Sequence, residues 1–326
     1  MKQIITALTL IVITLTQVFG QPTNLSFRFR NSAPENTLRI MEQNVKAVFD
    51  EINNASRENR KPRFSTVNIT NDGIIQILAL WAINKFHCVE PAYIENVSIN
   101  SSGNYQIRNI ATFFKGIEQS RDLVVDFDKA GRVANISIAI SRTQYKSMMQ
   151  TGNSVADFFE RQIIVEFIEN LRTAYELQDV NFIDTVFNDD ALIITGKKLI
   201  VRTGDGQYAT KTTYSKQNKQ QYINKLRTAI MAKDSHGNKL NKLTVDFDRI
   251  DVRKSEKGDS LYVVHLWQEW DSKGRINYND KGWLTFVIDF NDRNPTIWVR
   301  VWEDSNFKET ELYNFGCFYN PESCKK

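Results

Sequence analysis

The chain has 326 residues, a net charge of +4 and 25% charged residues. This length predicts about two domains, at roughly 150 residues per domain. With 41% hydrophobic residues, the composition is that of a globular protein and excludes wholesale disorder. The charge is too weak and too dispersed along the chain to indicate nucleic acid as a partner.

The N-terminus has the pattern of a secretory signal peptide, predicted at residues 1–20. Lys2 precedes the apolar run from Ile4 to Val18, and Gly20 offers a small residue for cleavage before Gln21. The alternative is an uncleaved anchor helix. No later run approaches the ~20 apolar residues of a membrane span. We therefore expect a secreted or periplasmic protein with no membrane span after signal cleavage.

A short polar linker is expected at residues 21–36, followed by an N-terminal α+β domain at 37–145. Apolar residues from Leu38 to Ile52 recur at helical spacing. A second apolar run, IIQILALWAI, follows Thr70 and Asn71, either of which could cap a helix; a core strand is the alternative. Four segments have strand character, at residues 92–99, 105–114, 122–127 and 133–140.

The second half, residues 155–305, begins again with a long amphipathic helix from Phe159. A short helix then breaks at Asn188-Asp189-Asp190 into a strand. Residues 196–214 are interpreted as a polar excursion, after which Ser215 could cap a third helix. Four long strands are predicted at 243–252, 261–270, 283–290 and 296–302.

The two halves end alike. The sequence VVDFD at 124–128 and the sequence VIDFN at 287–291 each precede a turn and a further strand. This pattern is typical of an internal duplication. Ordinary β-hairpins with polar turns would also produce it, so both alternatives stay open.

Residues 157–304 resemble the nuclear transport factor 2-like superfamily, also called SnoaL-like. The segments that carry the resemblance are RTAYELQDVNFIDTVFNDDALIITG, KQQYINKLRTAI and WLTFVIDFNDRNPTIWVRVWED. The length and the order of elements predict an α+β fold of two domains, and the resemblance implies that the C-terminal one is a cone-shaped, bent antiparallel sheet wrapped around helices, with a cavity inside. The N-terminal half would be a degenerate second copy or a different domain. The superfamily contains enzymes, ligand binders and scaffolds, so this fold alone does not define a function.

Alternation along the last strands predicts one aliphatic sheet face and one mixed face. If the mixed face lines the cone, it supplies a small-molecule site. The same composition also suits an interface with a protein partner or a second copy of the chain. The residues assigned to this face are His265, Trp267, Trp283, Asp289, Arg300 and Trp302.

The first hypothesis for function is an exported, non-catalytic ligand-binding or protein-interaction protein. Its ligand would be a small apolar molecule or a glycan, bound by Trp267, Trp283, Arg300 and Trp302. The alternative is an isomerase, cyclase or dehydratase that uses Asp289 or His265 as its base. No cofactor is expected. The three His residues have no ligand spacing, so no metal site is expected either.

Three cysteines are present, which is an odd number for an exported chain. Cys317 and Cys324 bracket a Pro-containing turn in the tail at 306–326, and they could form a disulfide. Cys88 would then remain as a small buried hydrophobic residue.

Overall fold

The structure is a computed structural model that describes residues 24–304, with gaps at 118–119, 151–154, 156, 205, 256–259 and 292–294. The described chain is an α+β protein whose large sheets are mainly antiparallel. The predicted signal peptide (1–20) and the tail with Cys317 and Cys324 lie outside the described residues. Within the part that is described, no helix combines the length and apolar character needed to cross a membrane.

The N-terminal half is a five-stranded antiparallel sheet that packs against two helices. The second apolar run forms a helix, and the side chain of Thr70 caps it by accepting a hydrogen bond from the backbone N–H of Gly73 at 3.1 Å. Both predicted helices and the predicted strands at 105–114, 122–127 and 133–140 are confirmed, whereas residues 92–99 form two short strands and the strand at 86–88 was not predicted. The helices are α1 (Glu35–Arg57) and α2 (Asn71–Ile83), and the strands are β2 (Phe86–Cys88), β4 (Ser98–Ile99), β5 (Tyr105–Phe114), β6 (Arg121–Phe127) and β7 (Val133–Ile138). Cys88 is buried as expected, and burial raises the pKa of its thiol to about 12.

The segment expected to be a linker contains a strand. β1 (Ser26–Arg30) pairs in parallel with β3 (Ala92–Asn96). Phe27 and Phe29 alternate with exposed residues and are buried in the N-terminal core. The expectation failed because a five-residue strand that itself contains Arg28 and Arg30 is too short to stand out from a polar background.

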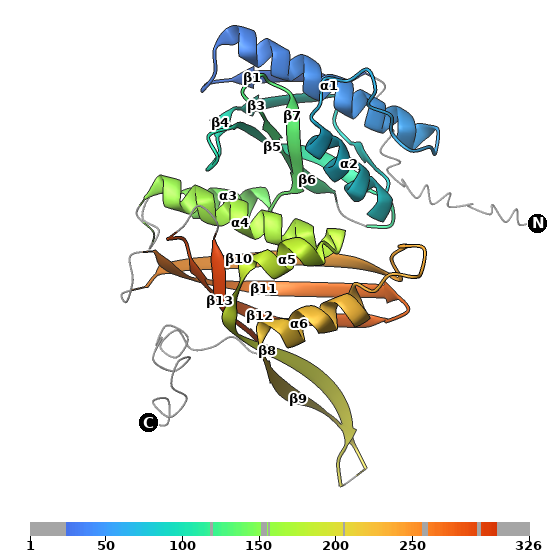
Figure 1. Cartoon of the computed structure of the whole chain (residues 1–326), viewed down its shortest axis with the longest axis vertical. Helices are drawn as coiled ribbons and strands as arrows, with labels where there is room; N and C mark the ends of the chain where they lie inside the picture. Colours follow the sequence, from blue (N-terminus) through green and yellow to red (C-terminus); the bar gives the residue numbers. More distant parts are fainter. Residues whose placement is uncertain are drawn as a thin grey trace, which may run out of the picture.

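The C-terminal half is a six-stranded sheet in the order β10-β11-β12-β13-β8-β9, antiparallel except for the pair β13–β8. Figure 1 shows α5 (Val180–Val186) and α6 (Lys219–Lys225) on one face of this sheet. The strands are β8 (Phe187–Arg202), β9 (Tyr208–Gln217), β10 (Asn241–Lys254), β11 (Leu261–Gly274), β12 (Tyr278–Asp289) and β13 (Thr296–Glu303). The four long strands predicted for this half are confirmed.

Two expectations for this half are corrected. Residues 196–214 are not an irregular excursion but belong to the β8–β9 hairpin, which extends away from the rest of the chain (Figure 1). Most side chains of β9 are exposed, so no apolar alternation marked it as a strand. Ser215 lies within β9, and the cap of α6 is Asn218, which forms a capping box with Gln221.

The helix α4 (Phe158–Leu177) lies between the two halves, beside α3 (Arg142–Met149) (Figure 1). From Arg161 to Leu177 every residue except Ile163 and Asn170 is buried. The sequence predicted the helix and its apolar stripe but not the burial of its polar side, which packs against the N-terminal half.

The polar side chains of α4 hydrogen-bond two edge strands. Thr173 accepts from the N–H of Ile138 in β7 at 3.0 Å, and Glu176 accepts from the N–H of Val245 in β10 at 2.9 Å. Arg172 donates to the carbonyl of Val245 and to that of Ala139, both at 2.9 Å. Because β7 and β10 each end a sheet, α4 satisfies backbone groups that would otherwise be buried without partners.

Two ion pairs reinforce the same helix. Arg108 pairs with Glu169, whose Oε1 also accepts from the N–H of Ile140 at 2.8 Å. Arg121 contacts both oxygens of Glu176, at 2.6 and 2.8 Å. All four side chains are at most 10% exposed. Removing one partner would therefore leave a buried charge without compensation.

We expect Arg108→Met to lower the free energy of unfolding by about 3–5 kcal/mol, because it leaves Glu169 charged and unpaired. Adding Glu169→Gln should recover part of that loss, since the amide oxygen can still accept from Ile140. Chemical denaturation measures both. The exposed pair Arg39–Glu35 is the control, where Arg39→Met should cost about 1 kcal/mol or less. Equal destabilisation in the single and double variants would contradict the prediction.

Candidate functional site

The strand register divides the residues predicted for one sheet face between two faces. In β13, Arg300 lies opposite Phe286 and Trp302 lies opposite Leu284. In β11, Trp267 lies opposite Trp283. The side of Leu284 and Phe286 is the one that packs against the helices. Arg300 and Trp302 therefore lie on the helix-facing side, and Trp267 and Trp283 lie on the other.

The expectation of one shared mixed face is thus wrong. It grouped strands by composition, whereas a shift of one residue in register moves a whole strand's side chains to the other face. A bulge between Ile297 and Val299 also breaks the simple alternation of faces along β13. As a result, Ile297 packs in the helix-facing core, whereas Val299 packs in the cluster on the outer face.

On the outer face, the ring of His265 stacks on Trp283 with centroids 4.7 Å apart. The Nδ1 atom of His265 lies 2.9 Å from the hydroxyl of Thr285. Asp289 sits at the end of β12 and accepts from the N–H of Asn291 at 2.9 Å. Neither of the two predicted bases, His265 or Asp289, lines the cavity on the helix-facing side.

A cavity of about 300 Å³ lies between α6 and the helix-facing side of the sheet. The wall from α6 and the π-helical turn after it is mostly apolar, whereas the sheet supplies several polar groups. Its lining residues are Thr195, Gly196, Lys197, Tyr222, Lys225, Leu226, Ala229, Ile230, Gln268, Trp270, Ile276, Tyr278, Asp280, Arg300 and Trp302. An apolar cavity with a few convergent polar groups is the usual form of a small-molecule site.

The guanidinium of Arg300 is the most unusual group of this cavity. Arg300 is only 5% exposed. Its Nη2 lies 3.5 Å from Oε1 of Gln268, and its Cζ lies 5.3 Å from the centre of the Tyr222 ring. The hydroxyl of Tyr175 also interacts with this guanidinium, yet among the described residues Nε and Nη1 of Arg300 have no hydrogen-bond partner of good geometry. Burying a charge in this state is costly, and a bound molecule would supply the missing acceptors.

Two indole N–H groups are, like Nε and Nη1 of Arg300, buried without a hydrogen-bond partner among the described residues. Trp270 and Trp302 are 4% and 1% exposed, and neither Nε1 has a partner in the described part of the chain. The rings of Trp270 and Tyr175 also meet in an edge-to-face arrangement, with centroids 5.1 Å apart. The hydroxyl of Tyr175 lies 2.9 Å from that of Tyr222. The helix α4 therefore reaches the lining of the cavity through Tyr175.

Two glycines make room for the Trp302 ring. A Cβ added at Gly196 of β8 would lie 1.8 Å from Cε3 of Trp302, and one added at Gly282 of β12 would lie 2.6 Å from Cε2. β8 and β12 are the two neighbours of β13. The indole thus packs where only glycine fits on either side.

Asp280 is the one carboxylic acid among the described residues that line the cavity. The sequence did not identify it as a site residue. It lies opposite Trp270, in a segment between two predicted strands for which no element was predicted. Burial raises its pKa to about 6, although the nearby charges of Arg300 and Lys198 favour the ionised form. Burial also raises the pKa of the neighbouring Tyr278, and so does the charge of Asp280. The only signal in the sequence was the alternation of Tyr278, Asp280 and Gly282 along one strand face.

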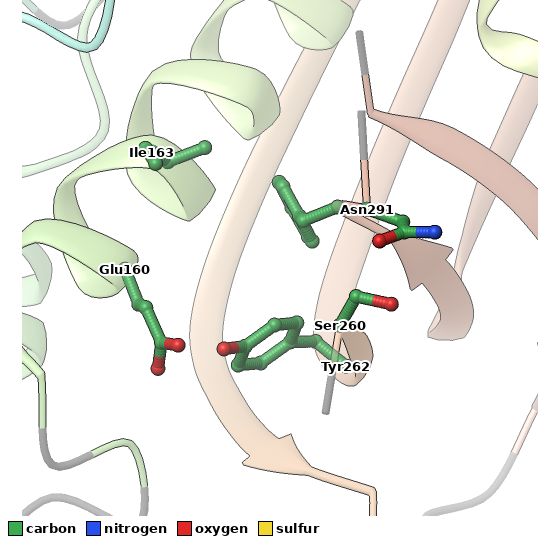
Figure 2. A pocket seen from close by; sticks show the side chains of 6 residues that line it. Glu160, Ile163, Ser260, Tyr262 and Asn291 are labelled. Carbon is green, nitrogen blue, oxygen red and sulfur yellow. The ribbon is translucent and has the colours of Figure 1, made fainter. Parts of the chain in front are cut away.

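A second hollow, shown in Figure 2, lies at the N-terminal end of α4 and has a volume of about 420 Å³. Glu160 and Ile163 from the helix face Tyr262 and Asn291 from the sheet side. The carboxylate of Glu160 is paired with Lys254 at 3.1 Å. Because its described charges are already paired, this hollow is a weaker candidate than the cavity with Arg300.

No protein-family model matches the chain, and no curated protein matches it. Solved structures with some likeness include Bd1075 of Bdellovibrio bacteriovorus, at 13% identity and TM-score 0.32, covering 55% of this chain and 46% of that one. An NTF2-like protein of Cytophaga hutchinsonii is 16% identical, with TM-score 0.31, covering 44% of this chain and 98% of that one. The β subunit of benzoate 1,2-dioxygenase from Burkholderia mallei is 12% identical, with TM-score 0.30, covering 43% and 87%.

The chain therefore spans less than half of Bd1075. All three TM-scores are below 0.5, so these likenesses say nothing about the function of this chain.

We expect Gly196→Ala to displace the Trp302 ring, because the new methyl group would overlap Cε3. The near-ultraviolet circular dichroism of Trp should change, and stability should fall by about 1–3 kcal/mol. Gly204→Ala is the matched control, since a Cβ there meets nothing within 4 Å. An unchanged Trp spectrum in Gly196→Ala would contradict this packing.

The raised pKa of Asp280 also predicts a pH-dependent stability. Because the folded-state value of about 6 exceeds the ordinary 3.8, ionised Asp280 destabilises the fold above pH 6, and the penalty disappears below about pH 4. Asp280→Asn should therefore raise the free energy of unfolding at pH 8, by up to about 3 kcal/mol, and change it little at pH 4. Denaturation at both pH values tests this, with the exposed Asp190→Asn as control. A gain at pH 4 as large as that at pH 8 would refute it.

Proposed function

We propose that the chain is an exported ligand-binding protein that holds a small molecule in the cavity between α6 and the six-stranded sheet. The observation that carries this proposal is Arg300, which is buried with two N–H-bearing nitrogens that have no described partner. Stability alone does not favour such a group, because apolar residues in place of a buried charge are often neutral or stabilising. A ligand that accepts from these nitrogens accounts for it.

We further propose that residues 157–304 form a nuclear transport factor 2-like cone. Two features support this assignment: the order of long helix, short helix, strand hairpin, helix and long strands, and a cavity on the helix-facing side of the sheet. The export of the chain rests on the pattern of residues 1–20.

An enzyme of the isomerase, cyclase or dehydratase type is the second candidate. Asp280 favours it, because a buried carboxyl with a pKa near 6 suits proton abstraction at neutral pH. Asp280 would take the role that the sequence suggested for His265 or Asp289. Non-catalytic binding is preferred, since Arg300 and the indole groups offer hydrogen bonds to a ligand without a defined second acid or base.

Intrinsic Trp fluorescence of the purified chain, titrated with a library of small metabolites and sugars, tests the proposal. A saturable change is expected because Trp270 and Trp302 line the cavity. It should be lost in Arg300→Leu and kept in the matched variant Trp267→Phe, whose side chain lies on the outer face. Arg300→Leu leaves Asp280 without the charge that favours its ionised form, so the double variant Arg300→Leu/Asp280→Asn is made as well. The double variant should melt at an equal or higher Tm because it removes both buried charges, and its loss of binding would not reflect unfolding.

Two results would overturn the proposed site. One is that no library member binds. The other is binding that Arg300→Leu leaves intact and Trp267→Phe abolishes, which would move the site to the outer face. Product formation in the same samples, followed by NMR, would favour the enzyme.

A further inference from the structure

We infer that the ligand of this cavity is an organic monocarboxylate, held by Arg300 and the indole N–H groups of Trp270 and Trp302, and that its binding protonates Asp280. This inference rests on the proposed function and specifies the chemical class of the ligand and the effect of pH.

The first step concerns hydrogen-bond direction. The four unpartnered atoms of the described cavity wall are Nε and Nη1 of Arg300 and Nε1 of Trp270 and of Trp302. All of them donate and none can accept. The nearest amide oxygen, Oε1 of Gln268, already lies toward Nη2 of Arg300. The ligand must therefore bring acceptor atoms, and an ionised oxygen forms the stronger bonds to a guanidinium.

The second step concerns charge. Lys197 and Lys225 line the same cavity as Arg300, and Nζ of Lys198 lies 5.7 Å from the Trp302 ring. Asp280 is the one acidic residue among the described lining residues. The cavity therefore carries an excess of positive charge and favours an anion over a neutral or cationic molecule.

The third step separates a carboxylate from a phosphate. The apolar part of the lining includes Leu226, Ala229, Ile230 and Ile276, which suits a hydrocarbon body. A doubly charged phosphate would place a second negative charge near Asp280, whereas a carboxylate adds only one. The volume of about 300 Å³ is at the small end of the range for ligand pockets, as expected for a small organic acid.

The fourth step gives the role of Asp280. The titratable or charged groups that line the cavity with it are Tyr278 of the same strand, Lys197 of β8, Arg300 of β13, and Tyr222 and Lys225 of α6; Lys198 of β8 lies beside it. β11 contributes only Gln268 and Trp270, which do not titrate in this range.

Without ligand, ionised Asp280 partly balances the charge of Arg300. A bound carboxylate replaces Asp280 as the counter-ion of Arg300. The negative charge of the ligand also repels the ionised side chain of Asp280, so Asp280 takes up one proton from solvent.

Isothermal titration calorimetry with matched acid and amide pairs tests the inference: benzoate and benzamide, phenylacetate and phenylacetamide, hexanoate and hexanamide, with benzylphosphonate as the dianionic probe. At least one acid should bind about tenfold or more tightly than its amide, since a charge-assisted bond exceeds a neutral one by about 1.4 kcal/mol. The same acid should bind roughly tenfold more tightly at pH 6 than at pH 8, with proton uptake.

Three variants separate the parts of the inference. Arg300→Gln should lose the preference for acid over amide, while Arg300→Lys should keep part of it because the charge remains. Asp280→Asn should bind the acid at pH 8 at least as tightly as the unsubstituted chain does, with an affinity that no longer changes between pH 6 and pH 8.

The inference is overturned if amides bind as well as their acids, if benzylphosphonate binds most tightly, or if library members bind while none of the acids does. In those three cases the cavity still binds a ligand and the proposed function stands. If neither the acids nor any library member binds, both fail. An acid that binds with an affinity independent of pH overturns the role of Asp280.

Discussion

The hydrogen bonds from α4 to two sheet edges are the interaction on which the rest of the structure depends. β7 and β10 each end a sheet, and exposed edges of this kind invite pairing with other strands. Here Thr173, Arg172 and Glu176 occupy the outward backbone groups of both edges. Arg172 touches Ala139 and Val245 at once, so one side chain joins the two halves. A single helix thus provides hydrogen-bond partners for backbone groups at both sheet edges. It also fixes the position of the two sheets relative to each other.

The same helix also orients the cavity. Tyr175 lies three residues after Arg172, meets the hydroxyl of Tyr222 in α6 and packs edge to face with Trp270. Tyr222 in turn lies beneath the guanidinium of Arg300. A continuous set of buried contacts therefore runs from the junction of the halves to the candidate site. A change in the packing of α4 would alter the cavity through Tyr175, whereas Trp267 and Trp283 on the outer face would be little affected.

Secondary structure was largely predictable because it is local. The stripe in α4 and the alternation in β11 and β12 follow directly from the sequence, whereas Ser215 was mistaken for a cap because the exposed strand β9 lacks an apolar pattern. The site was less predictable because it depends on pairing between strands. Arg300 and Trp302 were predicted to bind a ligand and do line the cavity, but grouping them with His265 and Asp289 required a register that composition does not specify. Asp280 was overlooked because its importance comes from burial alone.

The strongest argument for function is the contrast between two sets of buried polar groups in one chain. Around α4, Glu169, Arg172 and Glu176 lie in a core and are paired with side chains and backbone. In the cavity, Arg300, Trp270 and Trp302 are equally buried, yet four of their N–H-bearing atoms lack a described partner. Buried atoms without a partner elsewhere in the described chain are scattered singly, such as Nε2 of His87 and Oε1 of Gln217, whereas these four belong to the lining of one cavity. These donors converge on a single cavity whose lining is partly apolar. A bound ligand would explain this arrangement, whereas packing alone does not.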